Sequence, residues 1–491
     1  MIFSYFMNTS QSLKMTGIKH LICAFLFVAN AVAQPAATSL QNRMKQLLND
    51  DFFRRATAGI AVYDLTDQKM LYVHNEKRLS RPASNMKLLT SAAALSILTP
   101  EYFFKTELYY KGTIDESGQL SGDIFLAGGF DPELKTADLD ELILLMKKSG
   151  IQSINGNLYL DVSMGDSVHW GKAWSWDDDL EAFQPYLSPI PLNKGTVKLK
   201  VIPAMPCSAP IIKTEPESSF IQVTNHATTV LRATEPPAKT LRFSRESNGN
   251  NNLIVISGTI SASVNAYETM ISLKNPRGYI LTIFTEKMLE HLPGSNIRIA
   301  GTTRVPKDAH NLGCVTHSMA EVVNRLNKES DNLNAEMLLY ALGYRQNTDE
   351  PASSEKGIAV VRQMIAQIGF ESDSYSIVDG SGLSNQNYLT PELLLAVLKH
   401  MYQSQNSELF IQSLPIAGVD GTLAHRMKGP ATCRKLAAKT GSLTGVSALS
   451  GYLTARNGHL LAFSIMIQNF VEKTSFVAVN YIDKICEALA E

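Results

Sequence analysis

The segment at residues 87–98, KLLTSAAALSIL, constrains the fold because it contains no glycine or proline and is dominated by Leu and Ala. An apolar run of this length, which continues until just before Pro100, predicts a helix buried in the protein core. Ser84 or one of its neighbours is expected to begin this helix, since serine is a favoured residue at a helix start. The remaining elements must therefore build a core around it.

Ser84 and Lys87 form an S-x-x-K pattern at this helix start, and the pattern has two interpretations. In the first, Ser84 caps the helix and Lys87 is an ordinary solvated charge. In the second, Ser84 is a nucleophile and Lys87 is its base, because residues three apart lie on one face of a helix. The same spacing recurs at Ser353 and Lys356, in a polar, loop-like stretch with no sign of a site, so the pattern alone does not decide.

The N-terminal residues resemble a secretory signal. Lys14, Lys19 and His20 precede the apolar run LICAFLFVANAVA, which is too short to span a bilayer and ends in small residues. We expect a signal peptide at residues 1–33, with cleavage before Gln34, and the alternative is a retained membrane anchor. The mature protein is then expected to be soluble, secreted and periplasmic. The net charge of −1 gives no indication of a nucleic-acid partner.

Four cysteines follow the expected signal peptide, and their spacing leaves their state open. Four cysteines allow three disulfide pairings in an exported protein, and buried free thiols are equally compatible with this spacing. His310, Cys314 and His317 form a loose cluster, but it lacks the spacing of known zinc motifs. We therefore predict neither a metal nor a cofactor. The four residues are Cys207, Cys314, Cys433 and Cys486.

Hydrophobic periodicity and turn residues divide the rest of the chain into helices and strands. The expected elements are a hairpin at 58–75, short strands from 101 to 310 with helices at 137–150 and 277–292, helices at 317–330 and 331–343, strands at 434–443, 447–456 and 459–469, and a helix at 475–490.

This order predicts an α/β (α+β) fold in which a mixed insertion, itself interrupted by a β-rich segment, separates two parts of one domain. The expected divisions are a catalytic domain at 34–100 plus 310–491, an inserted domain at 101–200 plus 273–309, and a small β-rich domain at 201–272.

Two further motifs give the Ser84 segment a chemical context. Ser330-Asp331-Asn332 lies between two expected helices, and Lys439-Thr440-Gly441 lies in an expected strand. Each is weak alone. The ordered combination S-x-x-K, S-D-N and K-T-G is the set found in penicillin-recognising serine enzymes.

The chemistry explains why these residue types occur together. Ser84 would be the nucleophile, and a serine hydroxyl needs an adjacent base. Lys87 would be that general base, provided that burial and the nearby Lys439 cation lower its pKa. Ser330 would relay a proton to the departing amine.

The other motif residues would bind the substrate. Asn332 offers an amide to the peptide group, and Lys439 with Thr440 can bind the terminal carboxylate. Gly441 would let the substrate backbone approach the strand. The backbone N–H groups of Ser84 and Ser442 would form the oxyanion hole.

The sequence resembles the class C low-molecular-mass penicillin-binding proteins, which are serine D-alanyl-D-alanine carboxypeptidases and endopeptidases. The resemblance covers nearly the whole mature chain. Beyond the three motifs it rests on VDGSGLS at 378–384, GVDGTLAHRM at 418–427, GDIFLAGGFDPEL at 122–134 and WSWDDD at 174–179.

The resemblance implies a β-lactamase/DD-peptidase-like catalytic domain with two inserted domains. It implies cleavage of peptidoglycan stem peptides through an acyl-serine, at the terminal D-Ala or at the D-Ala–diaminopimelate cross-link, and acylation by β-lactams. It also implies that an acidic residue of the insertion meets the diaminopimelate amine, and Asp161 is the expected match. Phe130 departs from the family pattern, which often has glycine there.

Two other functions share some of these features. A serine β-lactamase has the same motifs but resembles a single domain, whereas this chain carries a long insertion. A non-catalytic penicillin-binding scaffold is opposed by the intact motif residues. Asp131 and Asp379 are interpreted as turn and loop residues rather than catalytic acids. A homo-oligomer is possible, and the sequence does not decide the oligomeric state.

Overall fold

A computed structural model of the chain describes residues 40–232, 235–246 and 252–491. The predicted signal peptide at residues 1–33 lies outside these residues. Within them, no helix has both the length and the apolar content needed to cross a bilayer. The chain folds into a mixture of helices and sheets, which confirms the predicted α+β class.

The catalytic part is built on a five-stranded antiparallel sheet with the order β14-β15-β16-β1-β2. The predicted N-terminal hairpin and the three predicted C-terminal strands are present, and they pair with one another in this sheet, although about 400 residues separate β1 from β16. Helix α11, at Ser475–Ala490, packs on one face of this sheet. The strands are β1 at Thr57–Asp64, β2 at Lys69–His74, β14 at Leu436–Leu443, β15 at Val446–Thr454 and β16 at Leu460–Gln468.

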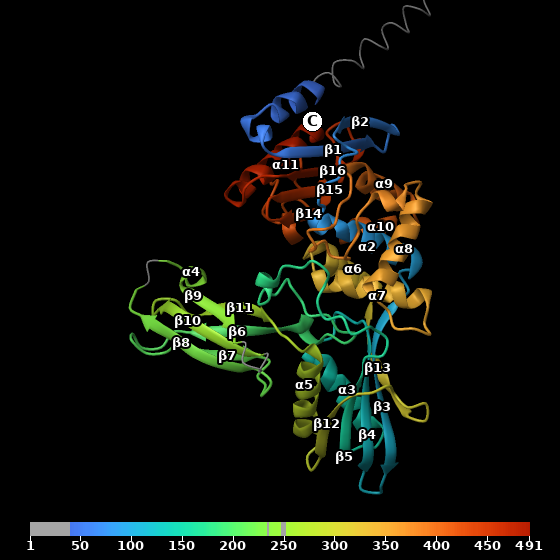
Figure 1. Cartoon of the computed structure of the whole chain (residues 1–491), viewed down its shortest axis with the longest axis vertical. Helices are drawn as coiled ribbons and strands as arrows, with labels where there is room; N and C mark the ends of the chain where they lie inside the picture. The colour runs from blue at the N-terminus through green and yellow to red at the C-terminus, as the bar shows by residue number, and fades with distance from the viewer. Residues whose placement is uncertain (1–39, 233–234, 247–251) are drawn as a thin grey trace, which may run out of the picture.

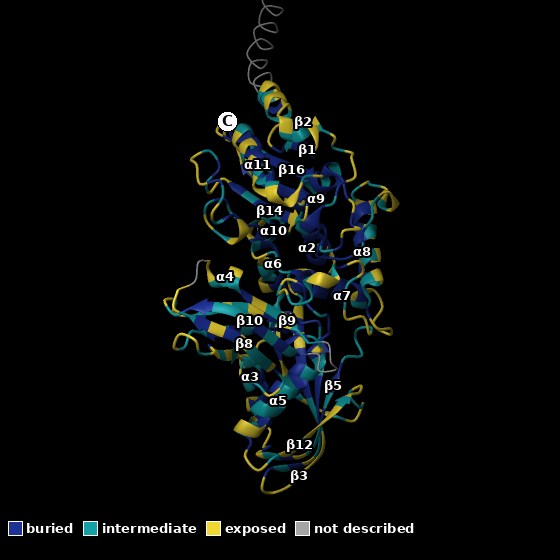
Figure 2. Ribbon diagram, turned by 60° about the vertical axis from the view of Figure 1, so that its left-hand side comes forward, coloured by how far each residue is buried: buried dark blue, intermediate teal, exposed yellow. Residues whose placement is uncertain are grey.

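A group of helices covers the other face of the sheet, and α2 lies at its centre. Most side chains of α2 are buried, as the apolar run predicts (Figure 2). The stretch around Ser353, predicted to be loop-like, is instead the start of helix α8. The helices of this layer are α2 at Met86–Ile97, α6 at Met319–Lys328, α7 at Asn332–Gln346, α8 at Ser354–Gln367, α9 at Pro391–Gln403 and α10 at Ser407–Ser413.

The insertion forms a second five-stranded sheet with the order β12-β5-β4-β3-β13. Its last strand, β13, pairs with β3, so we propose that the insertion continues to Ser318, beyond the predicted boundary at residue 309. The elements are β3 at Phe103–Ile114, β4 at Gln119–Gly129, α3 at Thr136–Lys148, β5 at Ser153–Asp161, α5 at Pro276–His291, β12 at Asn296–Thr302 and β13 at His310–Ser318.

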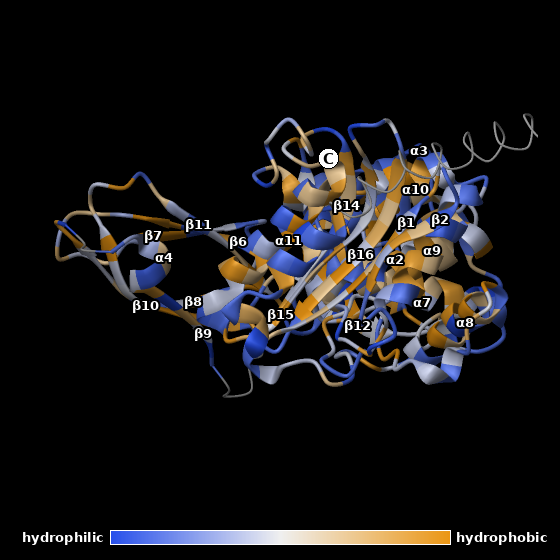
Figure 3. Cartoon of the chain, turned by 90° about the horizontal axis from the view of Figure 1, so that it is seen from above, coloured by the Kyte–Doolittle hydropathy of each residue, from blue (hydrophilic) through white to orange (hydrophobic). Residues whose placement is uncertain are grey.

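Two three-stranded sheets form the β-rich part, which projects to one side of the molecule (Figures 1 and 3). The predicted boundary at residue 200 falls inside β6, which pairs with β7 and β11. We therefore propose that this part spans Thr196–Ser272. Its elements are β6 at Thr196–Ile202, β7 at Ile211–Glu215, β8 at Gln222–Val230, α4 at Pro237–Thr240, β9 at Leu241–Arg245, β10 at Leu253–Ser261 and β11 at Tyr267–Ser272.

Candidate active site

Ser84 lies in a single 3-10 turn, Ala83–Asn85. This turn directly precedes helix α2 in the sequence and contacts strand β14. Two glycines let other backbone segments approach this turn closely. A Cβ atom on Gly441 would lie 2.7 Å from the Pro82 carbonyl oxygen, and one on Gly382 would lie 1.9 Å from that of Ala83. Gly441 thus accommodates the nucleophile segment itself, where the sequence suggested only substrate. The turn is held between two neighbouring chain segments.

The Ser84 hydroxyl does not cap helix α2. Asn85 occupies the position before the helix, and its side chain makes no capping hydrogen bond. Instead, Lys87 Nζ donates a hydrogen bond to Ser84 Oγ over 3.0 Å. Ala83 has a φ of 47°, a left-handed conformation that non-glycine residues rarely adopt and that is commonly found at functional sites. Because Lys87 is buried and bonds to Ser84, the interpretation of Lys87 as an ordinary solvated charge is wrong.

Lys87 is fully buried and makes three hydrogen bonds. Besides Ser84, its ammonium donates to Asn332 Oδ1 over 2.5 Å and to the Ser381 carbonyl oxygen over 2.7 Å. Burial lowers the pKa of Lys87 to about 8, against the opposing effect of nearby carboxylates. The predicted desolvation is therefore the main cause of the lowered pKa of Lys87. The Lys439 cation lies close enough to interact with Lys87, and this interaction contributes to the lowered pKa of Lys439.

Glu336, which was not predicted from the sequence, supports the loop that contacts Lys87. This buried side chain accepts hydrogen bonds from the backbone N–H groups of Gly380 and Ser381, the latter over 2.8 Å. Burial, together with the neighbouring Asp379 carboxylate, raises the pKa of Glu336 to about 8. The signal was present, because Glu336 lies one helical turn after Asn332.

Asp379 organises the loop that carries Ser381, as predicted for a loop residue. Its carboxylate accepts hydrogen bonds from the backbone N–H groups of Gly382 and Ser384. It also accepts a bond from Trp174 Nε1 over 3.0 Å, which ties the insertion to the catalytic part.

The Ser330–Asn332 motif occupies the junction of helices α6 and α7. Ser330 has a left-handed φ of 61°, and its hydroxyl accepts a hydrogen bond from Lys439 Nζ over 2.9 Å. Asp331 caps α7 by accepting a bond from the Asn334 N–H group. Asn332 contacts Lys87 through its oxygen, and its Nδ2 donates to the Phe183 carbonyl oxygen over 2.6 Å.

Lys439 is the second buried lysine of the site. Its ammonium contacts Ser330 and also donates to the Thr440 carbonyl oxygen over 3.0 Å. Burial and the nearby Lys87 cation hold the pKa of Lys439 well below its usual value. The hydroxyl groups of Thr440 and Thr422 lie 2.7 Å apart.

These residues surround one cavity of about 530 Å³, a size that suits a small peptide. Lys87, Lys439 and Gly441 are not on its wall. Four residues of the insertion close its other side, namely Ser175, Asp178, Phe183 and Gln184. Of the predicted residues, those that line the cavity are Ser84, Ser330, Asn332, Thr440 and Ser442.

Asp161 does not line this cavity, and its contact with the diaminopimelate amine stays a prediction. It ends strand β5, where its carboxylate accepts hydrogen bonds from the backbone N–H groups of Ser163 and Val305. It lines a different cavity with Arg277 and Arg304.

Asp178 is the acidic residue of the insertion that lines the Ser84 cavity. It belongs to the WSWDDD segment, whose Trp174 is buried against the catalytic part. Burial and the adjacent Asp177 raise the pKa of Asp178. The sequence pointed to the segment but not to this residue, because only the docking of the segment brings it to the cavity.

Phe130 adopts the left-handed conformation that explains why glycine is common at this position. Its φ is 59°, and its buried ring packs against Tyr340 and Tyr344 of helix α7. Asp131 next to it is a buried turn residue that bonds to the Glu133 N–H group and to His317 Nδ1. The insertion thus packs against helix α7, which begins with Asn332.

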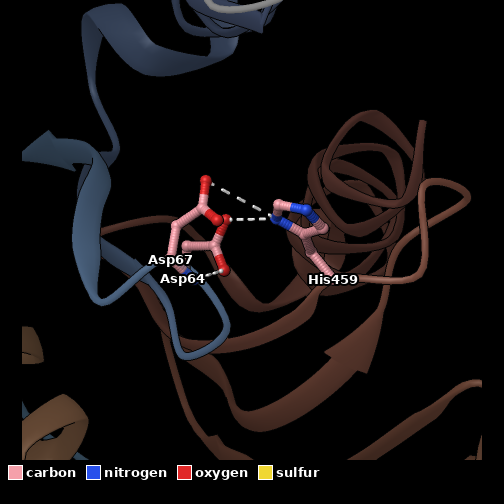
Figure 4. A group of neighbouring side chains, drawn as sticks. All are labelled: Asp64, Asp67 and His459. Atoms are coloured by element: carbon pink, nitrogen blue, oxygen red, sulfur yellow. Dashed lines mark hydrogen bonds and ion pairs between the residues drawn. The ribbon is translucent and has the colours of Figure 1, made fainter.

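The described residues give no sign of a catalytic role for cysteines or histidines. Cys207, Cys314, Cys433 and Cys486 are all free thiols. Asp64, Asp67 and His459 form a cluster of possible metal-ligand types at the far end of the β1–β2 hairpin (Figure 4). The Asp64 carboxylate is already bonded to His459 and to its own turn, and Lys69 lies 2.7 Å from Asp67. The cluster therefore works as a hydrogen-bonded end of the hairpin.

An S-x-x-K serine, an S-D-N loop and a K-T-G strand that meet at one cavity define the class of penicillin-recognising serine enzymes. Within that class, the chain belongs to the D-Ala-D-Ala carboxypeptidase 3 (S13) family, whose model matches residues 40–490.

Individual relatives agree with this membership. The chain is 28% identical to a D-alanyl-D-alanine carboxypeptidase from Actinomadura sp. (strain R39), over 87% of this chain and 81% of the relative. It is 27% identical to the D-alanyl-D-alanine carboxypeptidase DacB from Haemophilus influenzae, over 84% and 86%. The crystal structure of penicillin binding protein 4 from Haemophilus influenzae shares the fold, with a TM-score of 0.76, 24% identity and coverage of 92% and 98%.

Proposed function

We propose that this protein is a serine D-Ala-D-Ala carboxypeptidase and endopeptidase that acts on peptidoglycan stem peptides and is acylated by β-lactams. The observation that carries the proposal is the 3.0 Å hydrogen bond between Lys87 Nζ and the hydroxyl of Ser84, at the wall of a peptide-sized cavity. Family membership and the named carboxypeptidase relatives support the same activity. No cofactor takes part in the proposed chemistry.

The first half of the reaction forms an acyl-serine. Neutral Lys87 takes the proton of Ser84 Oγ, and the oxygen attacks the carbonyl carbon before the terminal D-Ala. The N–H groups of Ser84 and Ser442 hold the resulting oxyanion, an interaction typically worth about 10² to 10³ in rate per donor. Ser330 then relays to the departing amine the proton that Lys87 took from Ser84, and the peptide bond breaks.

Binding residues orient the peptide for this attack. Asn332 holds a peptide group, and Thr440 on the cavity wall binds the terminal carboxylate, with the buried Lys439 cation behind it. Water then cleaves the acyl-serine, which releases the shortened peptide and restores Ser84. In a cross-linked substrate the departing amine belongs to the neighbouring stem peptide, so the same steps give endopeptidase activity.

Asp178 replaces Asp161 in the proposed recognition of the diamino acid side chain. It is the acidic residue that the insertion contributes to the Ser84 cavity, and a carboxylate there attracts an ammonium group. The geometry favours a peptidase over a β-lactamase, because the insertion supplies cavity walls that a compact β-lactam does not need. Cell-wall peptides as substrates are consistent with a secreted, periplasmic protein.

The test labels the purified protein with a fluorescent penicillin and follows the decay of the adduct. Ser84→Ala should abolish labelling, and Ser353→Ala is the matched control because it alters the other S-x-x-K serine. Rapid loss of the label would instead indicate a β-lactamase. Equal labelling of Ser84→Ala and wild type would overturn the proposed nucleophile.

A parallel assay with a pentapeptide and a cross-linked dimer determines the substrate. Release of D-Ala measures carboxypeptidase activity, and release of monomers measures endopeptidase activity. Asp178→Asn should slow both reactions for substrates with a free side-chain amine and leave fluorescent penicillin labelling within about twofold. Equal loss on an acetylated side chain would contradict the assignment of Asp178.

A further inference from the structure

Two residues of the insertion, Glu133 and Lys194, lie beside the Ser330–Asn332 motif. Lys194 Nζ is 2.7 Å from Glu133 Oε1 and 3.2 Å from Asp331 Oδ2. The buried Glu133 carboxylate also pairs with Arg325 of helix α6 over 3.2 Å. This group of charges therefore joins the insertion to both helices that flank the motif.

Asn334 connects the same charges to the first turn of helix α7. Its Nδ2 atom donates to Glu133 Oε1 over 2.8 Å, and its Oδ1 atom accepts a hydrogen bond from Lys194 Nζ. Its backbone N–H group donates to Asp331 Oδ1 over 2.9 Å. Both carboxylate oxygens of Asp331 are thus occupied, one by the helix cap and one by Lys194.

The turn that presents Lys194 is held in an unfavourable conformation. Asn193 and Lys194 have φ values of 49° and 60°, so two successive non-glycine residues are left-handed. The Asn193 side chain fixes this turn by donating to Thr136 Oγ1 over 2.8 Å and to the Tyr279 hydroxyl over 3.0 Å. Such strain persists only where the surroundings impose it, and it is concentrated at functional positions.

The motif that Lys194 contacts is strained as well. Ser330 is left-handed, and in this conformation its hydroxyl lies 2.9 Å from Lys439 Nζ. A serine that was not held by its neighbours would favour the common conformations, which would move the hydroxyl. The next residue, Asp331, is the one that Lys194 and the helix cap hold in place.

We propose that Lys194, supported by Glu133, is a positioning residue for the reaction, because its ion pair with Asp331 holds Ser330 with its hydroxyl directed at Lys439. The insertion then completes the active site instead of only adding walls to the substrate cavity. This inference rests on the proposed function, since it concerns the proton transfer assigned to Ser330.

The test measures acylation of Ser84 by a fluorescent penicillin at several concentrations. Lys194→Met should lower the rate at saturating penicillin by about 10- to 100-fold, as expected for a displaced reacting group, with little change in the half-saturating concentration. Lys287→Met is the matched control. Lys287 lies on helix α5, and its ammonium forms a similar ion pair with Asp140 over 3.0 Å. The control should stay within about twofold of wild type.

Asp331→Asn is the second variant, and it keeps a side chain that can cap α7 while it removes the charge. If the ion pair is the cause, Lys194→Met combined with Asp331→Asn is no slower than the slower single variant. Thermal unfolding of every variant accompanies the kinetics. If Lys194→Met fails to fold, Glu133→Gln, which keeps an oxygen for Asn334, provides the test with a smaller loss in the same direction.

The outcomes separate the two proposals. A wild-type protein that takes up no label, or a Ser84→Ala variant that labels equally, would overturn the proposed function. If the wild type is labelled, and Lys194→Met is labelled as fast as Lys287→Met, only the positioning role is overturned. Losses that multiply in the double variant would also overturn it, because they would show that Lys194 and Asp331 act separately.

Discussion

Residues 84–87 and 353–356 have the same S-x-x-K spacing, and each pair lies at the start of a helix, but their side chains make different contacts. Ser84 Oγ accepts a hydrogen bond from the Lys87 ammonium, whereas Ser353 Oγ accepts one from the Lys356 backbone N–H group. Lys87 is fully buried, while Lys356 Nζ pairs with Glu350 at the surface.

The difference comes from what surrounds each helix start, since the four-residue pattern is the same. Helix α2 is enclosed by other helices and by the main sheet, so Lys87 loses its water and finds partners on α7 and on the Ser381 loop. The start of α8 faces solvent, so its serine is free to act as an ordinary cap. Burial turns the pattern into a pair suited to acyl transfer.

The strongest test of this difference between the two pairs is to replace each lysine in turn. Lys87→Met should lower the rate of penicillin acylation by about 10³-fold, because general-base catalysis typically contributes about 10²- to 10⁴-fold. Lys356→Met should leave the rate within about twofold of wild type. The measurement is the initial rate of fluorescent labelling at one pH, and comparable losses in both variants would contradict the distinction.

Two glycines offer the next test, because each receives the backbone of a neighbouring segment. A Cβ atom on Gly382 would lie 1.9 Å from the Ala83 carbonyl oxygen, and one on Gly357 would lie 2.1 Å from that of Leu339. Gly382→Ala should reduce labelling at least tenfold because it displaces the nucleophile turn, and it also strains a residue with a φ of 85°.

Gly357→Ala is the matched substitution at α8. It should lower the thermal unfolding temperature because it pushes α8 away from α7, while the folded fraction keeps most of its labelling rate. Labelling per folded molecule, measured below the unfolding transition, checks both variants. Equal labelling of Gly382→Ala and wild type would show that the turn does not depend on this close approach.

The sequence was sufficient for the elements with local patterns. The apolar run of α2 and the three C-terminal strands have clear periodicity, and the three motifs were found because each is short and contiguous. Helix α8 was not predicted, because the polar residues around Ser353 suit either a loop or a cap. No strand was predicted at β13, and its residues were assigned to the catalytic domain, because its pairing with β3 joins residues about 200 positions apart.

The parts of the site that depend on docking could not be read from the sequence. Asp161 and Asp178 are both acidic residues of the insertion, and only the packing of Trp174 against the catalytic part decides which one reaches the cavity. Glu336 looks like a surface residue of a helix until α7 is found to be buried along most of its length. Long-range packing therefore determined what the motifs alone left open.

The acylation rate should also depend on pH, because it depends on the protonation state of Lys87. The pKa of Lys87 is lowered to about 8, so the reactive neutral amine increases, and the rate rises, as the pH passes through this value. Glu336→Gln removes a group that raises the pKa of Lys87 when it is ionised, so the midpoint of the profile should move to lower pH. A midpoint that moves upward, or does not move, would contradict the role assigned to Glu336.

The same variant makes a prediction for stability. The folded-state pKa of Glu336 is raised to about 8, so the native protein binds a proton that the unfolded chain has lost above pH 4.5. Its contribution to the free energy of unfolding is therefore present below pH 4.5 and is lost as the pH rises toward 8. Glu336→Gln should flatten this part of the pH dependence, measured by urea unfolding between pH 5 and 8. An unchanged slope would show that the carboxyl group does not titrate in the native protein.

The smallest expected effect compares the two serines by stability alone. Ser353→Ala removes the cap of α8 and should lower the free energy of unfolding by about 1 kcal/mol. Ser84→Ala removes no cap, because the hydroxyl of Ser84 bonds to a side chain and not to the end of α2. It should therefore change the free energy of unfolding by less than Ser353→Ala while it abolishes labelling. Urea unfolding of both variants at pH 7 tests this, and a larger loss for Ser84→Ala would mean that the nucleophile also supports the helix it precedes.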